Sequence, residues 1–141
     1  MIKRAARKKI LPNVWMAPGG KREEYEGVFE CARRETKEET GLEIKNLKIL
    51  CSGVALLKDL GQEIFFHFVS ADYGSGKAKA SQEDGELKWL TLDKILNLDN
   101  LLAELKPVLP VVFGSQPRFI SYKAIYEKGN KMVEFEIEKG D

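Results

Sequence analysis

The chain has 141 residues, with 23 Lys and Arg against 22 Asp and Glu, and a net charge of +1 that neither favours nor excludes a nucleic-acid partner. Its apolar runs are only a few residues long, and none follows the first four residues, so we expect no transmembrane span and no secretory signal. Its two cysteines indicate a reducing compartment. We therefore expect a single cytoplasmic domain over residues 1–141, with no membrane partner.

A cluster of cations opens the chain. Its members are Lys3, Arg4, Arg7, Lys8 and Lys9. They would either form a solvated tail or face phosphate groups, as point charges or bidentate forks. An apolar segment that includes Trp15 follows, and residues 18–20 (Pro-Gly-Gly) predict a loop that permits unusual backbone angles.

A predicted helix over residues 27–40 is the most informative stretch. Gly41 follows it, at the position where a glycine commonly ends a helix. At about 100° per residue, Glu35, Glu38 and Glu39 lie within about 100° of one another on this helix. Neighbouring carboxylates repel one another unless a cation lies between them, and oxygen ligands suit Mg²⁺. The pattern therefore predicts a magnesium site, with a solvated acidic face as the alternative.

The remainder of the chain predicts strands alternating with short helices. Strands are expected over residues 47–57, 63–70, a short piece ending near 90, 119–126 and 131–138, a loop over 71–76, and helices over 92–96 and 99–106. Thr91 is the expected N-cap of the first of these helices, and Pro107 should end the second. In the last strand Val133, Phe135 and Ile137 alternate with glutamates, which predicts one buried and one solvated face.

The spacing of glycine, acidic and basic residues around the predicted helix resembles the signature of the Nudix hydrolases. The matching positions are Gly20, Glu26, Arg34, Glu35, Glu38, Glu39, Gly41 and Leu42. Thr36 departs from the pattern, because an aliphatic residue is usual there. Beyond the motif, the segments around Trp15, before Trp89 and after Phe119 resemble the MutT-like 8-oxo-dGTP diphosphatases, including the MutX type.

The resemblance implies an α/β fold, the Nudix α/β/α sandwich with a mixed central sheet, in which the motif forms a loop-helix-loop. Residues 1–4 resemble the end of the family's second strand, so we expect the usual first N-terminal strand to be absent from this sequence. Either the gene begins upstream, or another segment must cover the exposed sheet edge. The resemblance also implies hydrolysis of a nucleoside triphosphate to the monophosphate and pyrophosphate, with water as nucleophile and Mg²⁺ or Mn²⁺ as cofactor.

The resemblance assigns roles to the motif residues. Glu35, Glu38 and Glu39 would hold the metal, and Glu35, with Glu39 as second choice, would act as general base. Arg34 would orient these acids, paired with Glu26. The positions expected to contact substrate are Gly19, Gly20, Lys21, Trp15, Met16 and Glu104, and Gly41 is a structural position of the motif.

Further candidates concern the metal site and the recognition of the nucleobase. In the family an additional acid reaches the metals from the loop before Trp89, and Glu83 or Asp84 would fill this place, unless both face solvent. Met16 stands where the animal proteins carry an Asn that helps to read the base, and Glu104 lies near the place of an acidic pair. The aromatic residues expected either to stack on the base or to lie in the core are Trp15, Phe119 and Tyr122.

Three alternatives stay open at this point. The substrate could contain another nucleoside-diphosphate linkage, as in a nucleotide sugar or dinucleotide. The chain could be a non-catalytic module that binds a nucleotide and regulates a partner, although such modules typically lose the acids that are present here. Nucleic-acid binding through residues 3–9 is the weakest reading, so no stable nucleic-acid partner is expected. The expected partner is a small-molecule nucleotide, bound by a monomer or homodimer.

Overall fold

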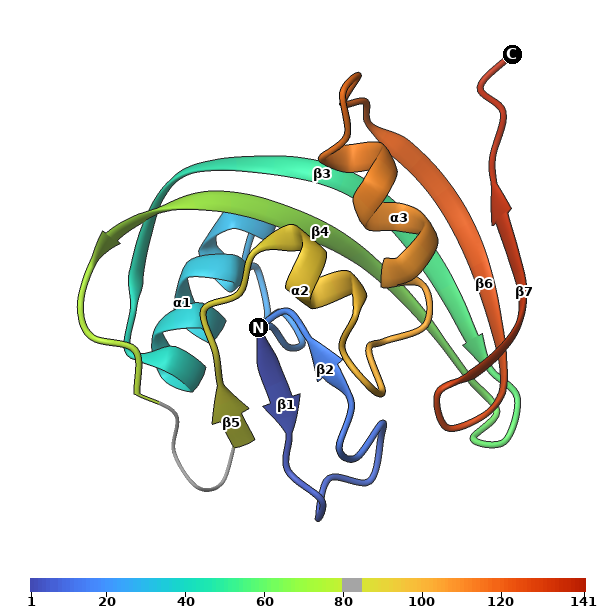
Figure 1. Ribbon diagram of the computed structural model, residues 1–141, viewed down its shortest axis with the longest axis horizontal. Coiled ribbons are helices and arrows are strands. Elements are labelled where there is room, and N and C mark those ends of the chain that lie inside the picture. The colour runs from blue at the N-terminus through green and yellow to red at the C-terminus, as the bar shows by residue number, and fades with distance from the viewer. Residues whose placement is uncertain (80–84) are drawn as a thin grey trace.

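The computed structural model describes residues 1–79 and 85–141 of the chain (Figure 1). The elements in this part are β1 (Ile2–Arg4), β2 (Trp15–Met16), α1 (Val28–Thr40), β3 (Glu43–Leu57), β4 (Gln62–Ser75), β5 (Gly85–Leu87), α2 (Leu92–Leu96), α3 (Leu105–Val112), β6 (Ile120–Lys128) and β7 (Lys131–Ile137). The predicted helices over residues 27–40 and 92–96 and the predicted C-terminal hairpin are therefore confirmed, with small differences at their ends.

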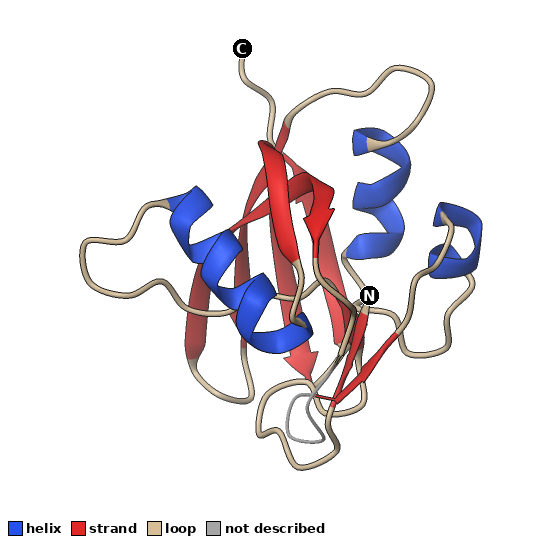
Figure 2. Ribbon diagram, turned by 90° about the vertical axis from the view of Figure 1, so that its left-hand side faces the viewer, coloured by secondary structure: helices blue, strands red, loops and turns tan. Residues whose placement is uncertain are grey.

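The strands form two sheets. The larger has the order β4-β3-β6-β7, with β3 and β6 parallel and the other neighbours antiparallel. The smaller has the order β2-β1-β5 and is antiparallel throughout. Helix α1 lies on one side of the larger sheet, and α2 and α3 lie on the other (Figure 2). This arrangement confirms the predicted sandwich with a mixed sheet. No helix within the described residues is long and apolar enough to cross a membrane.

The short strand β1 lies between two partners, so both of its edges are hydrogen-bonded. Ile2 lies opposite Met16 on β2 and opposite Leu87 on β5. The second partner comes from far along the chain. Other segments of the chain thus cover the sheet edge that was expected to be exposed at residues 1–4, and a covered edge cannot template aggregation.

The main core lies between the larger sheet and the segments around β2 and α3. Its buried residues are Val14, Trp15, Cys51, Ala55, Leu57, Leu101, Leu102, Leu105, Val108, Val112, Ile120, Tyr122, Ala124 and Tyr126. Gly53 on β3 lies beneath two rings of this core. A Cβ atom there would lie 2.5 Å from Cζ of Phe66 and 2.9 Å from Cζ of Tyr122. The strand therefore accepts both rings only because residue 53 has no side chain.

Helix α3 corrects the prediction for this region. Residues 99–106 were expected to form a helix stopped by Pro107, but the helix runs over Leu105–Val112. Pro107 lies in its first turn, where backbone N–H groups have no acceptor within the helix, so the ring is tolerated. Pro110 removes one internal hydrogen bond. The helix persists because its apolar side chains, including the fully buried Val108, pack into the core.

Strands β3 and β4 are longer than predicted. Residues 71–76 were expected to form a loop, but β4 continues to Ser75 and pairs with β3. On β3 the strand begins before Asn46, which has a φ of 53° within a shift of the strand register. An irregular position of this kind lets turn-forming residues stay inside a long ladder.

In β7 the predicted alternation is interrupted. A register shift beside Tyr126 places Met132 opposite that residue, and Met132 packs against the core. Val133 is therefore exposed, which corrects the prediction that it faces inward. Phe135 and Ile137 pack against the core as predicted. A bulge moves the inward position by one residue because side chains alternate along a strand.

Candidate active site

Glycine lies at both ends of α1. At its start the backbone N–H of Gly27 donates to the Glu30 carboxylate at 2.8 Å. At its end Gly41 has a φ of 74°, and its N–H donates to the carbonyl of Lys37 at 2.9 Å. Glycine adopts this left-handed conformation without strain. The helix therefore ends directly after the turn that carries the last two motif acids.

Arg34 connects the acids of the motif with the preceding loop. Its Nε and Nη2 donate to the two carboxylate oxygens of Glu26 at 2.8 and 2.9 Å. Its Nη1 donates to Glu35 at 2.7 Å and to Glu38 at 3.2 Å. Nη2 also donates to the carbonyl of Lys21 at 3.0 Å. A planar guanidinium with five N–H groups can donate hydrogen bonds to all these acceptors at once. This is the geometry that the predicted orienting role requires.

The same network controls ionisation around Arg34. Hydrogen bonds from Arg34, and in second place from the backbone N–H of Glu23, lower the pKa of Glu26 to about 2. The bonds to Glu26 and then to Glu35 raise the pKa of Arg34. Arg34 and Glu26 are therefore both charged at neutral pH, and each holds the other in place.

The loop at residues 18–20 lies directly against the acids. The N–H of Gly19 donates to Oε2 of Glu39 at 2.8 Å. A Cβ atom on Gly20 would lie 2.5 Å from both Cδ and Oε1 of Glu35. By contrast, a Cβ atom on Gly19 would meet nothing within 4 Å. Gly20 is therefore required by the space that the Glu35 carboxylate occupies.

Cys31 also belongs to this arrangement, although no role in the site was predicted for it from the sequence. Its Sγ lies 3.8 Å from the carbonyl oxygen of Gly20 and 3.8 Å from Nη2 of Arg34. Burial raises the pKa of the thiol, so Cys31 is a neutral packing group between loop and helix. Its position one helical turn before Arg34 and Glu35 is the sequence signal that could have indicated this contact.

The chemistry of the three acids suits a divalent cation. Glu35, Glu38 and Glu39 supply the carboxylate oxygens that hard cations prefer. The side chain of Glu35 is 15% exposed and that of Glu38 is 57% exposed. Within residues 1–79 and 85–141, no three acidic, His or Cys side chains gather around one point. The donor set fits Mg²⁺, and here Arg34 donates to Glu35 and Glu38 while the N–H of Gly19 donates to Glu39.

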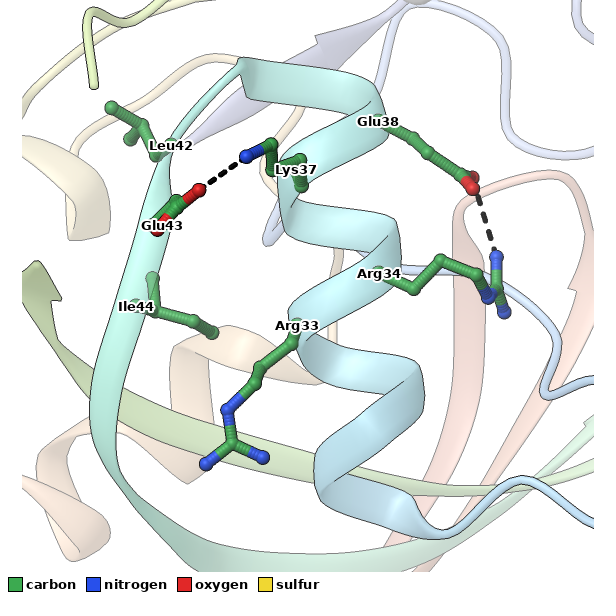
Figure 3. Close-up of a pocket in the computed structure, with 7 residues that line it drawn as sticks. All are labelled: Arg33, Arg34, Lys37, Glu38, Leu42, Glu43 and Ile44. Atoms are coloured by element: carbon green, nitrogen blue, oxygen red, sulfur yellow. Dashed lines mark hydrogen bonds and ion pairs between the residues drawn. The ribbon is translucent and has the colours of Figure 1, made fainter. Parts of the chain in front are cut away.

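A groove of about 400 Å³ runs along α1 beside the start of β3. Its lining residues are Arg33, Arg34, Lys37, Glu38, Leu42, Glu43 and Ile44. Figure 3 shows Lys37 pointing toward Glu43, with which it forms an ion pair, while Arg34 and Glu38 point away from β3. Glu38 is thus the one motif acid that borders the groove, whereas Glu35 and Glu39 do not line it.

The structure separates the residues predicted to contact substrate. Lys21 is exposed and Met16 is half-buried. Trp15 and Tyr122 are buried in the core, whereas Phe119 is exposed. Of the two expected alternatives, Trp15 and Tyr122 thus lie in the core, and the three rings do not form one stacking wall. The two loop acids predicted as further metal ligands, Glu83 and Asp84, lie outside the described residues.

Glu104 lies in a buried polar cluster. The residue is 3% exposed, and the hydroxyl of Tyr126 donates to its carboxylate at 3.2 Å. Burial raises the pKa of Glu104 to about 7, opposed by the hydrogen bond from Tyr126. The buried hydroxyl of Tyr122 has no hydrogen-bond partner among the described residues. Glu104 therefore lies beneath the surface, and a base could not contact it directly in this arrangement.

Comparisons with known proteins agree with this geometry. Residues 1–112 match the family description of the NUDIX domain. The chain is 35% identical over 88 residues to YvcI of Bacillus subtilis, an uncharacterised Nudix hydrolase, which covers 60% of this chain and 55% of that protein. The chain thus spans about half the length of this relative. The crystal structure of the mutator MutT protein from Bacillus halodurans superposes with a TM-score of 0.81 at 25% identity, covering 97% of this chain and 87% of that one. The chain therefore belongs to the Nudix family.

Proposed function

We propose that the protein is a magnesium-dependent pyrophosphohydrolase that cleaves a nucleoside triphosphate to the monophosphate and pyrophosphate. The observation that carries this proposal is the close packing of the glycine loop on the acids of α1. Gly20 leaves no room for a side chain above Glu35, and Gly19 donates to Glu39. Backbone and carboxylates thus meet where a phosphate chain and a cation would be held together.

The residues of the site would have different roles in this reaction. Glu35, Glu38 and Glu39 would hold Mg²⁺ or Mn²⁺, and a bound cation would neutralise phosphate charge and make water more acidic. Arg34 orients two of these acids, Glu35 and Glu38, by donating a hydrogen bond to each. Water adds to one of the two phosphorus atoms that flank the oxygen bridging the α and β phosphates. The bond from that phosphorus to the bridging oxygen breaks, and the bridging oxygen leaves with the other phosphorus, which gives the monophosphate and pyrophosphate. The proton of the water passes to Glu35, with Glu39 as the second candidate base.

The substrate would contact the glycine loop and the residues around it. Gly19 and Gly20 would present backbone to the phosphates, and the exposed Lys21 would add a point charge. The half-buried Met16 would touch the base. Trp15 and Glu104 are buried and would shape that contact from beneath. An oxidised purine such as that of 8-oxo-dGTP is one candidate base. We further propose a cytoplasmic enzyme that acts as a monomer or homodimer.

Turnover with a substrate panel tests the proposal. The protein is incubated with Mg²⁺ and dNTPs, 8-oxo-dGTP, a nucleotide sugar or a dinucleotide, and released pyrophosphate and monophosphate are measured. We expect pyrophosphate and monophosphate in equal amounts from a triphosphate. A Glu38→Gln variant should lose at least about a hundredfold in kcat. Glu63→Gln, an exposed acid on β4, is the matched control. Turnover of only a diphosphate-linked compound would favour the alternative substrate, and nucleotide binding without any turnover would favour the regulatory module.

A further inference from the structure

Two aromatic side chains lie exposed and in contact with each other outside the motif. The rings of Tyr73 and Trp89 are 6.4 Å apart between centroids, at an interplanar angle of 82°. Tyr73 is 55% exposed and Trp89 is 71% exposed. Aromatic side chains usually bury most of their surface, so a solvent-exposed pair is a candidate for binding another flat group.

Tyr73 is held at the acidic end of α1. Its hydroxyl donates to the carbonyl of Gly76 at 2.8 Å. Gly76 in turn packs on Gly41, because a Cβ atom on Gly76 would lie 2.5 Å from the carbonyl oxygen of Gly41. Gly41 is the residue that ends α1, two positions after Glu39. The Tyr73 side chain is therefore anchored beside the turn that carries the acids Glu38 and Glu39.

Trp89 reaches the same region from the smaller sheet. Strands β2 and β5 are both antiparallel to β1, so they run in the same direction. Met16 and Leu87 both lie opposite Ile2, so these two strands end at the same level. Two strand spacings, about 10 Å, separate them. Trp89 comes shortly after the end of β5, and the glycine loop comes shortly after the end of β2. Both segments therefore leave the smaller sheet at the same end.

The charges around the pair suit a nucleotide. The segment after Gly76 carries Lys77 and Lys79, both exposed, and the backbone N–H of Lys79 donates to the carbonyl of Thr40 at 2.8 Å. Two cations therefore lie on a segment that follows Tyr73 in the chain and contacts the end of α1. A ligand with a flat base and a chain of phosphates would match both features.

We propose that Tyr73 and Trp89 form the platform on which the base of the nucleotide stacks, an inference that rests on the proposed function. The phosphates lie at the acids and the glycine loop, and the base reaches outward to the two rings. Stacking recognises the flat face of any base. The platform therefore accepts nucleotides with different bases and contributes affinity for the base without selecting one by hydrogen bonds.

Calorimetric titration with a non-hydrolysable nucleotide, α,β-methylene-dATP with Mg²⁺, tests the platform. We expect Trp89→Ala to weaken binding about tenfold. Trp89→Phe should restore most of the affinity because a ring is kept. Inorganic pyrophosphate, which has no base, should bind wild type and Trp89→Ala equally. The matched control is Phe65→Ala, a side chain on the same strand as Tyr73 that is 67% exposed, and this variant should bind like wild type.

Two results would overturn the inference. One is equal nucleotide affinity of Trp89→Ala and wild type, and the other is an equal loss of pyrophosphate affinity in the variant. Thermal unfolding of each variant confirms the fold, and Tyr73→Ala gives a second test if Trp89→Ala is unstable. A wild-type protein that turns over nucleotides while Trp89→Ala binds normally refutes only the platform. A wild-type protein without any turnover refutes the proposed function itself.

Discussion

Replacing Gly20 by Ala should lower the hydrolytic activity strongly and leave the stability of the fold nearly unchanged. The new Cβ atom would lie 2.5 Å from Cδ of Glu35, whereas ordinary contacts begin near 3.4 Å. The Glu35 carboxylate must therefore retreat by about 1 Å. It is the flexible end of a long side chain, so retreat is cheap for the fold. The displacement nevertheless disturbs its 2.7 Å bond to Arg34 and its place beside the glycine loop.

A misplacement of about 1 Å in a catalytic group can reduce the rate about a hundredfold. We therefore expect kcat/KM for dNTP hydrolysis to fall by about this factor in Gly20→Ala. The melting temperature should move by less than about 4 °C, because a partly exposed ion pair contributes about 1 kcal/mol or less.

The assay combines pyrophosphate release with thermal unfolding of the same preparations. Gly19→Ala is the comparison, because a Cβ atom there would meet nothing within 4 Å. Its loss of activity should be at least tenfold smaller than that of Gly20→Ala. If Gly20→Ala kept full activity, or if Gly19→Ala lost as much, the space around Glu35 would not explain the glycine.

Three further substitutions probe the network, the core and the buried acid. Arg34→Lys keeps the charge but loses the fork, so we expect turnover to fall about 10- to 100-fold. Gly53→Ala places a Cβ atom 2.5 Å from the partly buried ring of Phe66 and should lower the free energy of unfolding in urea by about 1–3 kcal/mol. Burial raises the pKa of Glu104 from 4.5 to about 7, so the folded chain keeps this proton to higher pH than the unfolded chain. Wild-type stability should therefore fall by about 3 kcal/mol as the pH rises from about 4.5 to about 7, and Glu104→Gln should abolish this loss.

For each of these substitutions, one result would contradict the expected effect. Full activity of Arg34→Lys would mean that charge alone orients the acids. An unchanged urea midpoint for Gly53→Ala would mean that the facing rings move freely. A wild-type stability that is constant between pH 4.5 and 7, measured in the same urea series, would mean that Glu104 is not shielded from water as its 3% exposure indicates.

The elements with a clear local signal could be predicted from the sequence. Helix α1 has a glycine at each end and no strand-forming run, so its range could be predicted to within one residue. The terminal hairpin could be predicted because β-branched and aromatic residues flank the Gly129 turn. In both cases the residues that decide the structure are close together in the chain.

Elements that depend on distant contacts could not be predicted. Residues 71–75 were expected to lie in a loop but belong to β4, because the first residues of β3 pair with them. Pro107 was expected to end a helix and instead lies in the first turn of α3, where the core holds the apolar side chains. The exposure of Val133 depends on a shift of register that local alternation does not reveal.

In the candidate site, too, the features set by local sequence could be predicted and those set by distant contacts could not. The positions of the motif acids on one helix follow from helical geometry, so they could be predicted. The contact between Gly20 and Glu35 joins residues 15 apart in the chain, and only the motif's resemblance pointed to it. The burial of Glu104 depends on the packing of Tyr126, which lies on another element. The exposed pair of Tyr73 and Trp89 likewise joins β4 to the segment that follows β5.

The most direct test of the central claim is the binding of Mn²⁺, followed through the loss of its free electron-paramagnetic-resonance signal. The account predicts saturable binding to the wild-type protein, and loss of this binding when Glu35, Glu38 and Glu39 are all replaced by Gln. Glu63→Gln should bind Mn²⁺ like wild type. No binding to wild type, or equal binding to the triple variant, would contradict the claim that these acids hold a divalent cation.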